Sequence, residues 1–157
     1  MKIAIYPGSF DPITKGHLDV LKTGAEIFDK VIIAVSYNPE KQSFLTVEER
    51  VSLIKASIED LKNVEVDSFE GLTVEYAKQK GANVLLRGLR AVSDFEYEMQ
   101  LCQTNSSLSK NIKTVFLTTR PKYNFISSST VRDVALFGGD ISKFVPDAVN
   151  EYLKSKR

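Results

Sequence analysis

The chain of 157 residues is 43% hydrophobic and 26% charged, which is typical of a globular protein, and its length predicts a single domain over residues 1–157. A net charge of +1 argues against non-specific nucleic-acid binding, because that requires a strongly basic surface. The single cysteine, Cys102, excludes an internal disulfide and a cysteine-based zinc site, and no apolar run reaches the roughly 20 residues of a membrane span, so we expect a cytoplasmic protein without nucleic-acid or membrane partners.

Short apolar runs, several of them rich in β-branched residues, predict strands that alternate with helices. The predicted strands cover residues 2–6, 31–36, 64–68, 84–86 and 114–118. Strands separated by helices pair in parallel through right-handed crossovers, so the sequence predicts an α/β fold with a doubly wound, five-stranded parallel sheet. Such sheets bind ligands beyond the carboxyl ends of their strands. The site is therefore expected in the segments that follow them, which are residues 7–17, 37–42, 69–73, 87–90 and 119–129.

Apolar residues at helical spacing predict the helices between these strands. In chain order the patterns run from Leu18 to Phe28, from Val47 to Leu61, from Thr73 to Lys80, from Ser93 to about Ser107, from Val131 to Leu136, and from Pro146 to about Lys154. The second and fourth open with capping-box patterns, at residues 46–49 and 93–96. Pro146 suits the first turn of the last helix.

The segment after the first strand holds the one histidine of the chain, His17. A turn from strand to helix points backbone N–H groups and the positive helix end at a bound anion, and a phosphate is the expected occupant. Gly8 and Gly16 permit close backbone approach. Thr14 and His17 are three residues apart at the helix start, so both side chains can face one ligand. A lone histidine is more often structural, and it is this context that favours a functional role.

The sequence contains neither the Walker phosphate-binding pattern nor G-x-G-x-x-G. Instead, Thr14-Lys15-Gly16-His17, together with Ile126-Ser127-Ser128-Ser129-Thr130 near the far end, resembles the [TH]-x-G-H signature of the nucleotidylyltransferase superfamily. Within it, the chain is similar to the bacterial phosphopantetheine adenylyltransferases over nearly its whole length. That similarity rests on Pro7-Gly8-Ser9-Phe10-Asp11-Pro12, Arg87-Gly88-Leu89-Arg90 and Asp94-Phe95-Glu96-Tyr97-Glu98-Met99-Gln100-Leu101.

The resemblance implies a Rossmann-like nucleotidylyltransferase fold and a reaction of ATP with 4′-phosphopantetheine that gives dephospho-coenzyme A and pyrophosphate. It also implies Mg²⁺ held mainly by substrate phosphates, a homohexamer, and feedback inhibition by coenzyme A. The attacking phosphate already carries negative charge, so the site must supply alignment and positive charge, and it needs no base. No protein ligand for a metal is expected, because Mg²⁺ in such sites is usually held by substrate phosphates and water.

Three residues are implied to be catalytic. His17 would donate a hydrogen bond to an α-phosphate oxygen, Lys41 would bridge the phosphates of the two substrates, and Arg90 would add positive charge. The protonation state of His17 is open, because the ordinary pKa of histidine is about 6.5. Without the resemblance, Lys41 would be interpreted as a solvated loop lysine. Gln42-Ser43 stands where the family usually has a basic or small residue followed by Pro or Gly, so the residues that usually stiffen this loop are missing.

The resemblance also implies the two binding sites. Around ATP it places Ser9, Phe10, His17, Gly88, Leu89, Arg90, Glu98, Tyr123, Asn124, Phe125, Ile126, Ser127, Ser128 and Ser129. Around the acceptor it places Ser9, Lys41, Leu72, Thr73, Arg87 and Asn105. The implied partner of the Glu98 carboxylate is a pair of ribose hydroxyls, which can donate to both of its oxygens.

Structural interpretations of the same residues stay open. Arg87 and Arg90 could form surface ion pairs with Asp94 or Glu96. Glu98 and Asn105 could belong to a solvated helix face, and the serines could only cap a helix. Apolar residues near the C-terminus could serve the core or a subunit contact, namely Phe137, Ile141, Phe144 and Val145.

Two other functions remain as alternatives. One is a different nucleotidylyltransferase, acting on nicotinamide mononucleotide or transferring a cytidylyl group. The other is a non-catalytic sensor of nucleotides or coenzyme A on the same fold. The Arg-Gly-Leu-Arg segment argues against the first, and retention of His17, Lys41 and Arg90 argues against the second.

Overall fold

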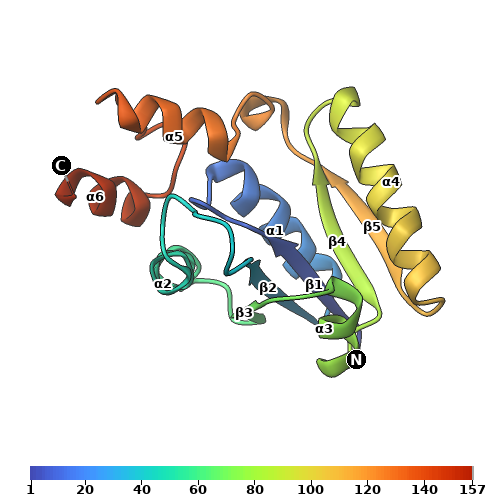
Figure 1. Cartoon of the computed structure of the whole chain (residues 1–157). Coiled ribbons are helices and arrows are strands. Elements are labelled where there is room, and N and C mark those ends of the chain that lie inside the picture. Colours follow the sequence, from blue (N-terminus) through green and yellow to red (C-terminus); the bar gives the residue numbers. More distant parts are fainter. Residues whose placement is uncertain (157) are drawn as a thin grey trace.

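A computed structural model describes residues 1–156 of the chain, and at Ser93 it describes the backbone alone. All five strands lie in one parallel sheet with the order β3-β2-β1-β4-β5, and helices cover both of its faces (Figure 1). The predicted α/β fold with a doubly wound, five-stranded parallel sheet is confirmed. Within residues 1–156, none of the helices is both long and apolar enough to cross a membrane.

The sheet consists of β1 (Ile3–Gly8), β2 (Lys30–Ser36), β3 (Val64–Phe69), β4 (Val84–Leu89) and β5 (Lys113–Thr118). The helices are α1 (Lys15–Ile27), α2 (Val47–Ser57), α3 (Thr73–Gln79), α4 (Val92–Leu108), α5 (Ser128–Leu136) and α6 (Asp147–Ser155). A short 3₁₀ turn that the sequence did not predict, η1 (Pro121–Tyr123), lies between β5 and α5.

Three strands continue further than predicted, β3 by the single residue Phe69 and the other two by two or more residues. Pro7 and Gly8 stay in β1, paired with β2, and Arg87 and Gly88 stay in β4, paired with β5. The prediction that these residues lie in loops after their strands is wrong. Backbone hydrogen bonds extend the ladder beyond the apolar side chains on which the prediction relied, so the functional segments begin inside the sheet.

Three helix boundaries also differ from the sequence prediction. Helix α2 ends at Ser57, so Ile58 lies beyond it, although the Ile58 side chain is still buried in the core. The apolar pattern therefore predicted correctly that Ile58 is buried, but it placed the end of the helix too far along the chain. Helix α4 starts at Val92, so the capping box predicted to begin at Ser93 is wrong, and Pro146 is the N-cap of α6, not part of its first turn.

The other predicted capping box, at the start of α2, is confirmed. The Glu49 N–H donates to Thr46 Oγ1 over 3.1 Å, and the Thr46 N–H donates to Glu49 Oε1 over 3.0 Å. Each side chain therefore satisfies a backbone N–H that the helix itself leaves free.

The sheet separates two apolar layers. The larger one packs against α1, α2 and the C-terminal segment, and the smaller one packs under α3. Ile141 and Val145 are fully buried in the larger layer, and Phe144 packs against it. Of the four apolar residues with two possible roles, only Phe137 is exposed, at 86% of its surface. Most of the apolar residues near the C-terminus therefore belong to the core.

Helix α1 lies unusually close to β4. A Cβ atom added at Gly24 would lie 2.5 Å from Leu86 Cδ2, and one added at Gly88 would lie 2.8 Å from Val20 Cγ2. Both distances are too short for real Cβ atoms, so glycine is needed at each position. This approach brings the N-terminus of α1, with His17, over the carboxyl ends of β1 and β4.

We expect Gly24→Ala to destabilise the protein. Overpacking against the buried Leu86 side chain costs about 1–3 kcal/mol. The better helix propensity of alanine returns roughly 0.5–1 kcal/mol of that cost. The free energy of unfolding, measured with denaturant, should fall by about 1 kcal/mol or more, whereas Lys22→Ala on the exposed face of α1 should change it by less than about 0.5 kcal/mol. A Gly24→Ala protein as stable as the unchanged chain would contradict the close packing of α1 on β4.

Candidate active site

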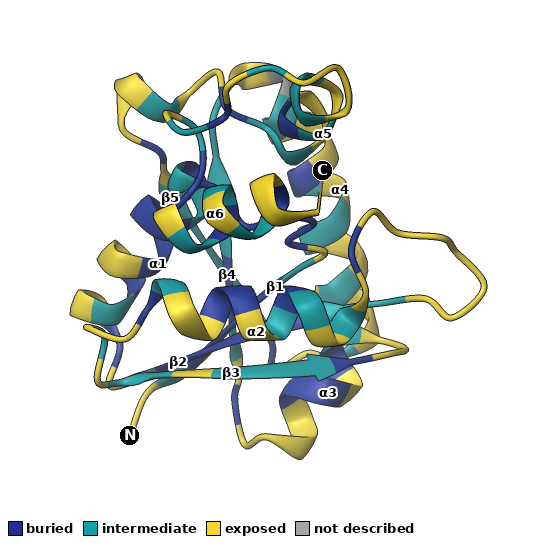
Figure 2. Cartoon of the chain, turned by 90° about the vertical axis from the view of Figure 1, so that its left-hand side faces the viewer, coloured by how far each residue is buried: buried dark blue, intermediate teal, exposed yellow. Residues whose placement is uncertain are grey.

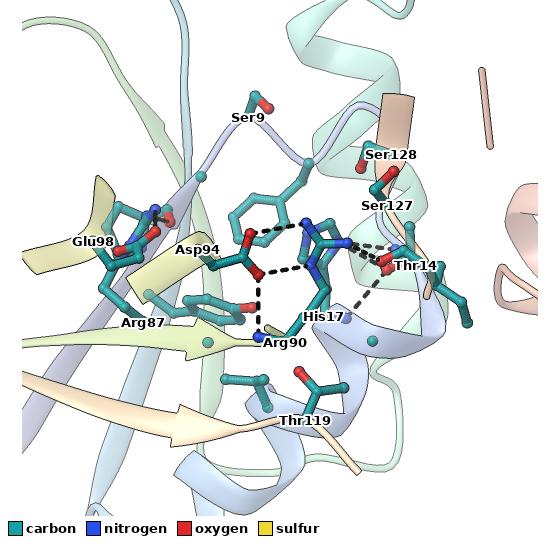
Figure 3. Close-up of a pocket in the computed structure, with 18 of the residues that line it drawn as sticks. Ser9, Thr14, His17, Arg87, Arg90, Asp94, Glu98, Thr119, Ser127 and Ser128 are labelled. Atoms are coloured by element: carbon teal, nitrogen blue, oxygen red, sulfur yellow. Dashed lines mark hydrogen bonds and ion pairs between the residues drawn. The ribbon is translucent and has the colours of Figure 1, made fainter. Parts of the chain in front are cut away.

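Two adjoining cavities open at the carboxyl ends of β1 and β4, where the strand order switches. The first, of about 380 Å³, lies between the turn after β1 and the starts of α1, α4 and α5 (Figure 3). The second, of about 300 Å³, lies between the sheet and α4. The residues that line both cavities are Pro7, Gly8, Ser9, Arg87, Tyr97 and Glu98. The arrangement suits two ligands that meet at a shared wall.

The capping interactions at the start of α1 fix the ring of His17. Nδ1 of the ring accepts a hydrogen bond from the Thr14 N–H over 3.0 Å, and the His17 N–H donates to Thr14 Oγ1 over 3.2 Å. The ring also meets the Phe10 ring edge-on, with centroids 4.9 Å apart. Because Nδ1 is an acceptor, this hydrogen-bond pattern assigns the proton of the neutral imidazole to Nε2.

His17 is neutral near pH 7. Burial, and then the positive charges of Arg90 and Arg87, lower the pKa of His17 from 6.5 to about 4. The structure therefore answers the question of protonation that the sequence left open. His17 offers the cavity a single Nε2–H donor without a net charge, held in one orientation by Thr14.

Arg87 is held by a buried carboxylate. Its Nε–H donates to Glu98 Oε2 over 2.8 Å, Nη2 donates to Oε1 over 2.6 Å, and Nη1 donates to the Pro7 carbonyl over 2.8 Å. Burial works against the charge, but the hydrogen bonds and charge of Glu98 raise the pKa of Arg87 overall. Three of the five guanidinium N–H groups are thus occupied, and two remain for a ligand at the shared wall.

Arg90 is connected to two other segments. Nη1 donates to the Ile126 carbonyl over 3.0 Å, and Nε lies 3.4 Å from Asp94 Oδ2. The same carboxylate oxygen accepts from the N–H groups of Arg90 and Ala91 at the start of α4. Of the ion pairs considered from the sequence, only Arg90 with Asp94 is present. Arg87 pairs with Glu98, one helical turn further along.

The serine run forms the start of α5. Ser127 Oγ accepts from the Thr130 N–H over 3.2 Å, so the expected capping role is confirmed. Ser128 Oγ donates to the Pro12 carbonyl over 2.8 Å, which connects this helix start to the turn after β1. Both serines line the first cavity, so the positive end of α5 and two hydroxyl groups border the same space as His17.

Comparison with known proteins identifies the family. Residues 5–134 match the family model described as Cytidylyltransferase-like. The chain is 53% identical over 156 residues to the phosphopantetheine adenylyltransferase of Caldanaerobacter subterraneus subsp. tengcongensis, covering 99% of this chain and 98% of that protein. It is 58% identical over 144 residues to the one from Cyanothece sp., covering 92% and 85%. The chain belongs to the phosphopantetheine adenylyltransferase family.

A solved structure agrees with the fold. A candidate nicotinate-nucleotide adenylyltransferase from Vibrio parahaemolyticus superposes with a TM-score of 0.77 at 22% identity, covering 99% of this chain and 94% of that one. At 22% identity the structural similarity shows only that the two proteins share a fold. It agrees with the nucleotidylyltransferase fold expected from the sequence.

Most of the residues that the family resemblance placed around the substrates come together. The first cavity is lined by Ser9, Phe10, His17, Arg87, Gly88, Arg90, Glu98, Ile126, Ser127 and Ser128. The second is lined by Thr73 and Asn105, next to the shared Ser9, Arg87 and Glu98. Positions from five separate segments of the chain thus converge on one edge of the sheet.

The other predicted residues line neither cavity. They are Lys41, Leu72, Leu89, Tyr123, Asn124, Phe125 and Ser129. Lys41 lies in an exposed loop, and Leu72 is 56% exposed before α3. Tyr123 lies next to the cationic groups of Arg120 and Lys122, 5.4 and 5.0 Å from its ring centroid, and Phe125 is 65% exposed.

Several lining residues were not singled out from the sequence, among them Tyr6, Tyr97 and Thr119. Thr119 directly follows β5, in a segment where the rule of strand ends predicts the site, and Tyr6 lies inside β1, two residues before its end. Tyr97, which lines both cavities, precedes Glu98 on α4, and only the packing of that helix reveals its place. Burial raises the pKa of Tyr6, so its hydroxyl stays protonated and serves as a neutral polar group.

The carboxylates of the first cavity are already engaged. Glu98 is paired with Arg87, and Asp94 is paired with Arg90. Across the described part of the chain, no cluster of three or more His, Cys, Asp or Glu residues could hold a metal ion. A divalent cation that enters with the triphosphate of a nucleotide fits this donor set, because its ligands then come from phosphates and water.

The protonation of His17 gives a direct test. As His17 is the one histidine of the chain, its ring signal in NMR titrates without overlap, and we expect a pKa of about 4 with the Nε2–H tautomer. A folded-state pKa below the unfolded value of about 6.5 means that the folded protein binds fewer protons between these values. The His17 contribution to the free energy of unfolding is therefore complete above about pH 6.5 and is lost as the pH falls toward about 4.

The matched variant for this test is His17→Gln. Its free energy of unfolding should lack the change between about pH 6.5 and 4 that is due to His17, while the contributions of other titrating groups remain. A measured pKa near 6.5 in the folded protein would overturn the neutral-donor assignment.

Proposed function

We propose that this protein transfers the adenylyl group of ATP to 4′-phosphopantetheine, giving dephospho-coenzyme A and pyrophosphate. The observation that carries the proposal is the pair of cavities that share a wall at Ser9, Arg87 and Glu98. One cavity suits a nucleotide at the switch in strand order, and the other suits the acceptor beside it. Membership in the phosphopantetheine adenylyltransferase family supports the identity of both substrates.

In this proposal the reaction is an in-line displacement at the α-phosphorus of ATP. An oxygen of the acceptor phosphate, held by Ser9 and the two free N–H groups of Arg87, forms a bond to that phosphorus. The bond from the α-phosphorus to the oxygen that bridges to the β-phosphorus breaks on the opposite side, and pyrophosphate leaves with the electron pair. The attacking oxygen is already anionic, so no proton has to be removed.

His17 stabilises the crowded transition state in this scheme. The neutral Nε2–H donates to a non-bridging oxygen of the α-phosphate, where negative charge is concentrated, and Thr14 keeps the ring oriented for it. Lys41, which bridges the phosphates of the two substrates, and Arg90 supply the net positive charge. Ser127, Ser128, Ser129 and the start of α5 receive the departing β- and γ-phosphates, which suit a helix N-terminus.

The remaining residues bind the outer parts of the substrates. Glu98 keeps one acceptor position on each carboxylate oxygen beyond its bonds to Arg87, and these can take ribose hydroxyls. We assign Gly88 and Leu89 to backbone contacts with ATP, and Phe10 with residues 123–126 to its nucleoside side. Leu72, Thr73 and Asn105 border the pantetheine arm in this assignment. Mg²⁺, bound to the phosphates of ATP, would neutralise charge on the leaving group.

Pyrophosphate release tests the proposal. We expect it only when ATP and 4′-phosphopantetheine are both present, and nicotinamide mononucleotide as acceptor or CTP as donor should give none. His17→Ala should lower kcat by about 10²–10³-fold, as the loss of one transition-state donor does elsewhere. Lys15→Ala, at the same helix start but outside both cavities, is the matched control and should keep kcat within about 2-fold.

The competing functions predict other outcomes. A sensor would bind one or both ligands without releasing pyrophosphate, and a different nucleotidylyltransferase would use another pair of substrates. Near-normal turnover in folded His17→Ala would reject the role given to the imidazole.

We also propose a homohexamer that coenzyme A inhibits and that acts in the cytoplasm. Exposed apolar side chains just after α5 and at the start of α4 support an assembly, because Phe137 and Val92 are 86% and 87% exposed. Sedimentation should give a particle of six times the chain mass, and Phe137→Ser should shift it toward smaller species. A monomer at micromolar concentration would contradict the assembly and leave the reaction itself unaffected.

A further inference from the structure

The loop between β2 and α2 carries Lys41 and is exposed from Asn38 to Phe44, where it stands away from the body of the protein (Figure 2). Within the described part of the chain, the Lys41 ammonium group has no hydrogen bond or ion pair. The position of this loop is fixed by contacts near its end, at residues 43–45.

The first of these contacts comes from Asp11, in the turn after β1. Asp11 Oδ2 accepts from the Phe44 N–H and Oδ1 accepts from the Leu45 N–H, each over 2.8 Å. Only 6% of Asp11 is exposed. A carboxylate at such depth requires strong donors, and two backbone N–H groups of the loop provide them. These two hydrogen bonds thus connect the loop that carries Lys41 with the turn that carries Ser9 and leads to His17.

The second contact comes from Arg50 on α2, which is 4% exposed. Nη1 donates to the Ser9 carbonyl over 2.9 Å, and Nη2 donates to Ser43 Oγ over 3.4 Å. Ser43 Oγ in turn donates to the Leu45 carbonyl over 2.6 Å. One guanidinium therefore connects the turn after β1 with the end of the Lys41 loop. The Ser43 hydroxyl takes part in the connection.

We propose that Asp11, Arg50 and Ser43 are positioning residues that hold Lys41 at a fixed distance from Ser9, in the turn after β1, and from His17, at the start of α1. The proposal rests on the adenylyl transfer inferred above, in which Lys41 bridges the phosphates of the two substrates. The lysine side chain is flexible, so its ammonium group can reach the phosphates reliably only if the backbone of Lys41 is held at a fixed position relative to the other donors. A misplacement of about 1 Å at such a site can cost roughly 10²-fold in rate.

A double-mutant cycle separates positioning from a general contribution to folding. Asn at position 11 can accept only one of the two loop N–H groups, so Asp11→Asn should lower kcat by about 10–100-fold when Lys41 is present. In a Lys41→Ala background the same change should cost less than about 3-fold, because the group that it positions is gone. Equal losses in both backgrounds would overturn the proposal.

Ser43→Ala keeps the cycle informative if Asp11→Asn does not fold. Ser43 lies in the exposed loop, so its loss should leave the melting temperature unchanged, while kcat falls by about 2–5-fold with Lys41 and stays level without it. Ser52→Ala, an exposed serine on α2, is the matched control and should have no effect in either background. A kcat for Ser43→Ala equal to that of Ser52→Ala would count against the role of Ser43.

Hydrogen exchange of residues 38–45 provides a reading that does not depend on turnover. Asp11→Asn and Ser43→Ala should each speed exchange in this segment, and Ser52→Ala should not. Unchanged exchange would overturn the proposed anchoring even if kcat falls. A wild-type protein that releases no pyrophosphate would refute the proposed function, and the anchoring would still be decided by the exchange rates.

Discussion

The site depends on the way in which β1 and β4 lie side by side while the chain leaves them in opposite directions. From β1 the sheet grows through β2 to β3, and from β4 it grows to β5, so no crossover helix covers the space between their carboxyl ends. The first cavity occupies this space. Helix α1 comes close enough to border it because Gly24 and Gly88 leave room against Leu86 and Val20. The placement of His17 is therefore a consequence of packing several residues away.

The electrostatics of the site follow from this placement. Two arginines face the cavity, and each is oriented by a carboxylate of α4, Glu98 for Arg87 and Asp94 for Arg90. These ion pairs hold both guanidinium groups in place before a ligand binds. Binding of phosphates therefore costs less side-chain entropy. Burial of the ring, and then the same positive charges, keep His17 neutral. Cationic and neutral donors thus coexist in one cavity because burial and the neighbouring cations both disfavour protonation of the imidazole.

Much of this could be predicted from sequence. The apolar runs and helical spacings predict the parallel α/β sheet. The rule that ligands bind at strand ends places the motifs that carry the family resemblance at the carboxyl edge of this sheet. Three kinds of information were missing. The continuation of β4 through Arg87 and Gly88 is set by backbone pairing, which the side chains do not indicate. The partner of Arg87 depends on how α4 packs, and only Asp94 and Glu96 were considered for it from the sequence, whereas the structure pairs it with Glu98. The pKa of His17 depends on burial and on the charges of Arg87 and Arg90, which are distant in the sequence, so the sequence left its protonation open.

The central claim is that a neutral His17 and the oriented arginines act on a triphosphate lying next to an acceptor phosphate. A crystal structure with 4′-phosphopantetheine and an ATP analogue whose α,β-bridge cannot be cleaved tests this most directly. The account predicts Nε2 of His17 within about 3.2 Å of an α-phosphate oxygen, with the acceptor oxygen opposite the bridging group. A triphosphate bound elsewhere, or an acceptor phosphate on the same side as the leaving group, would contradict it.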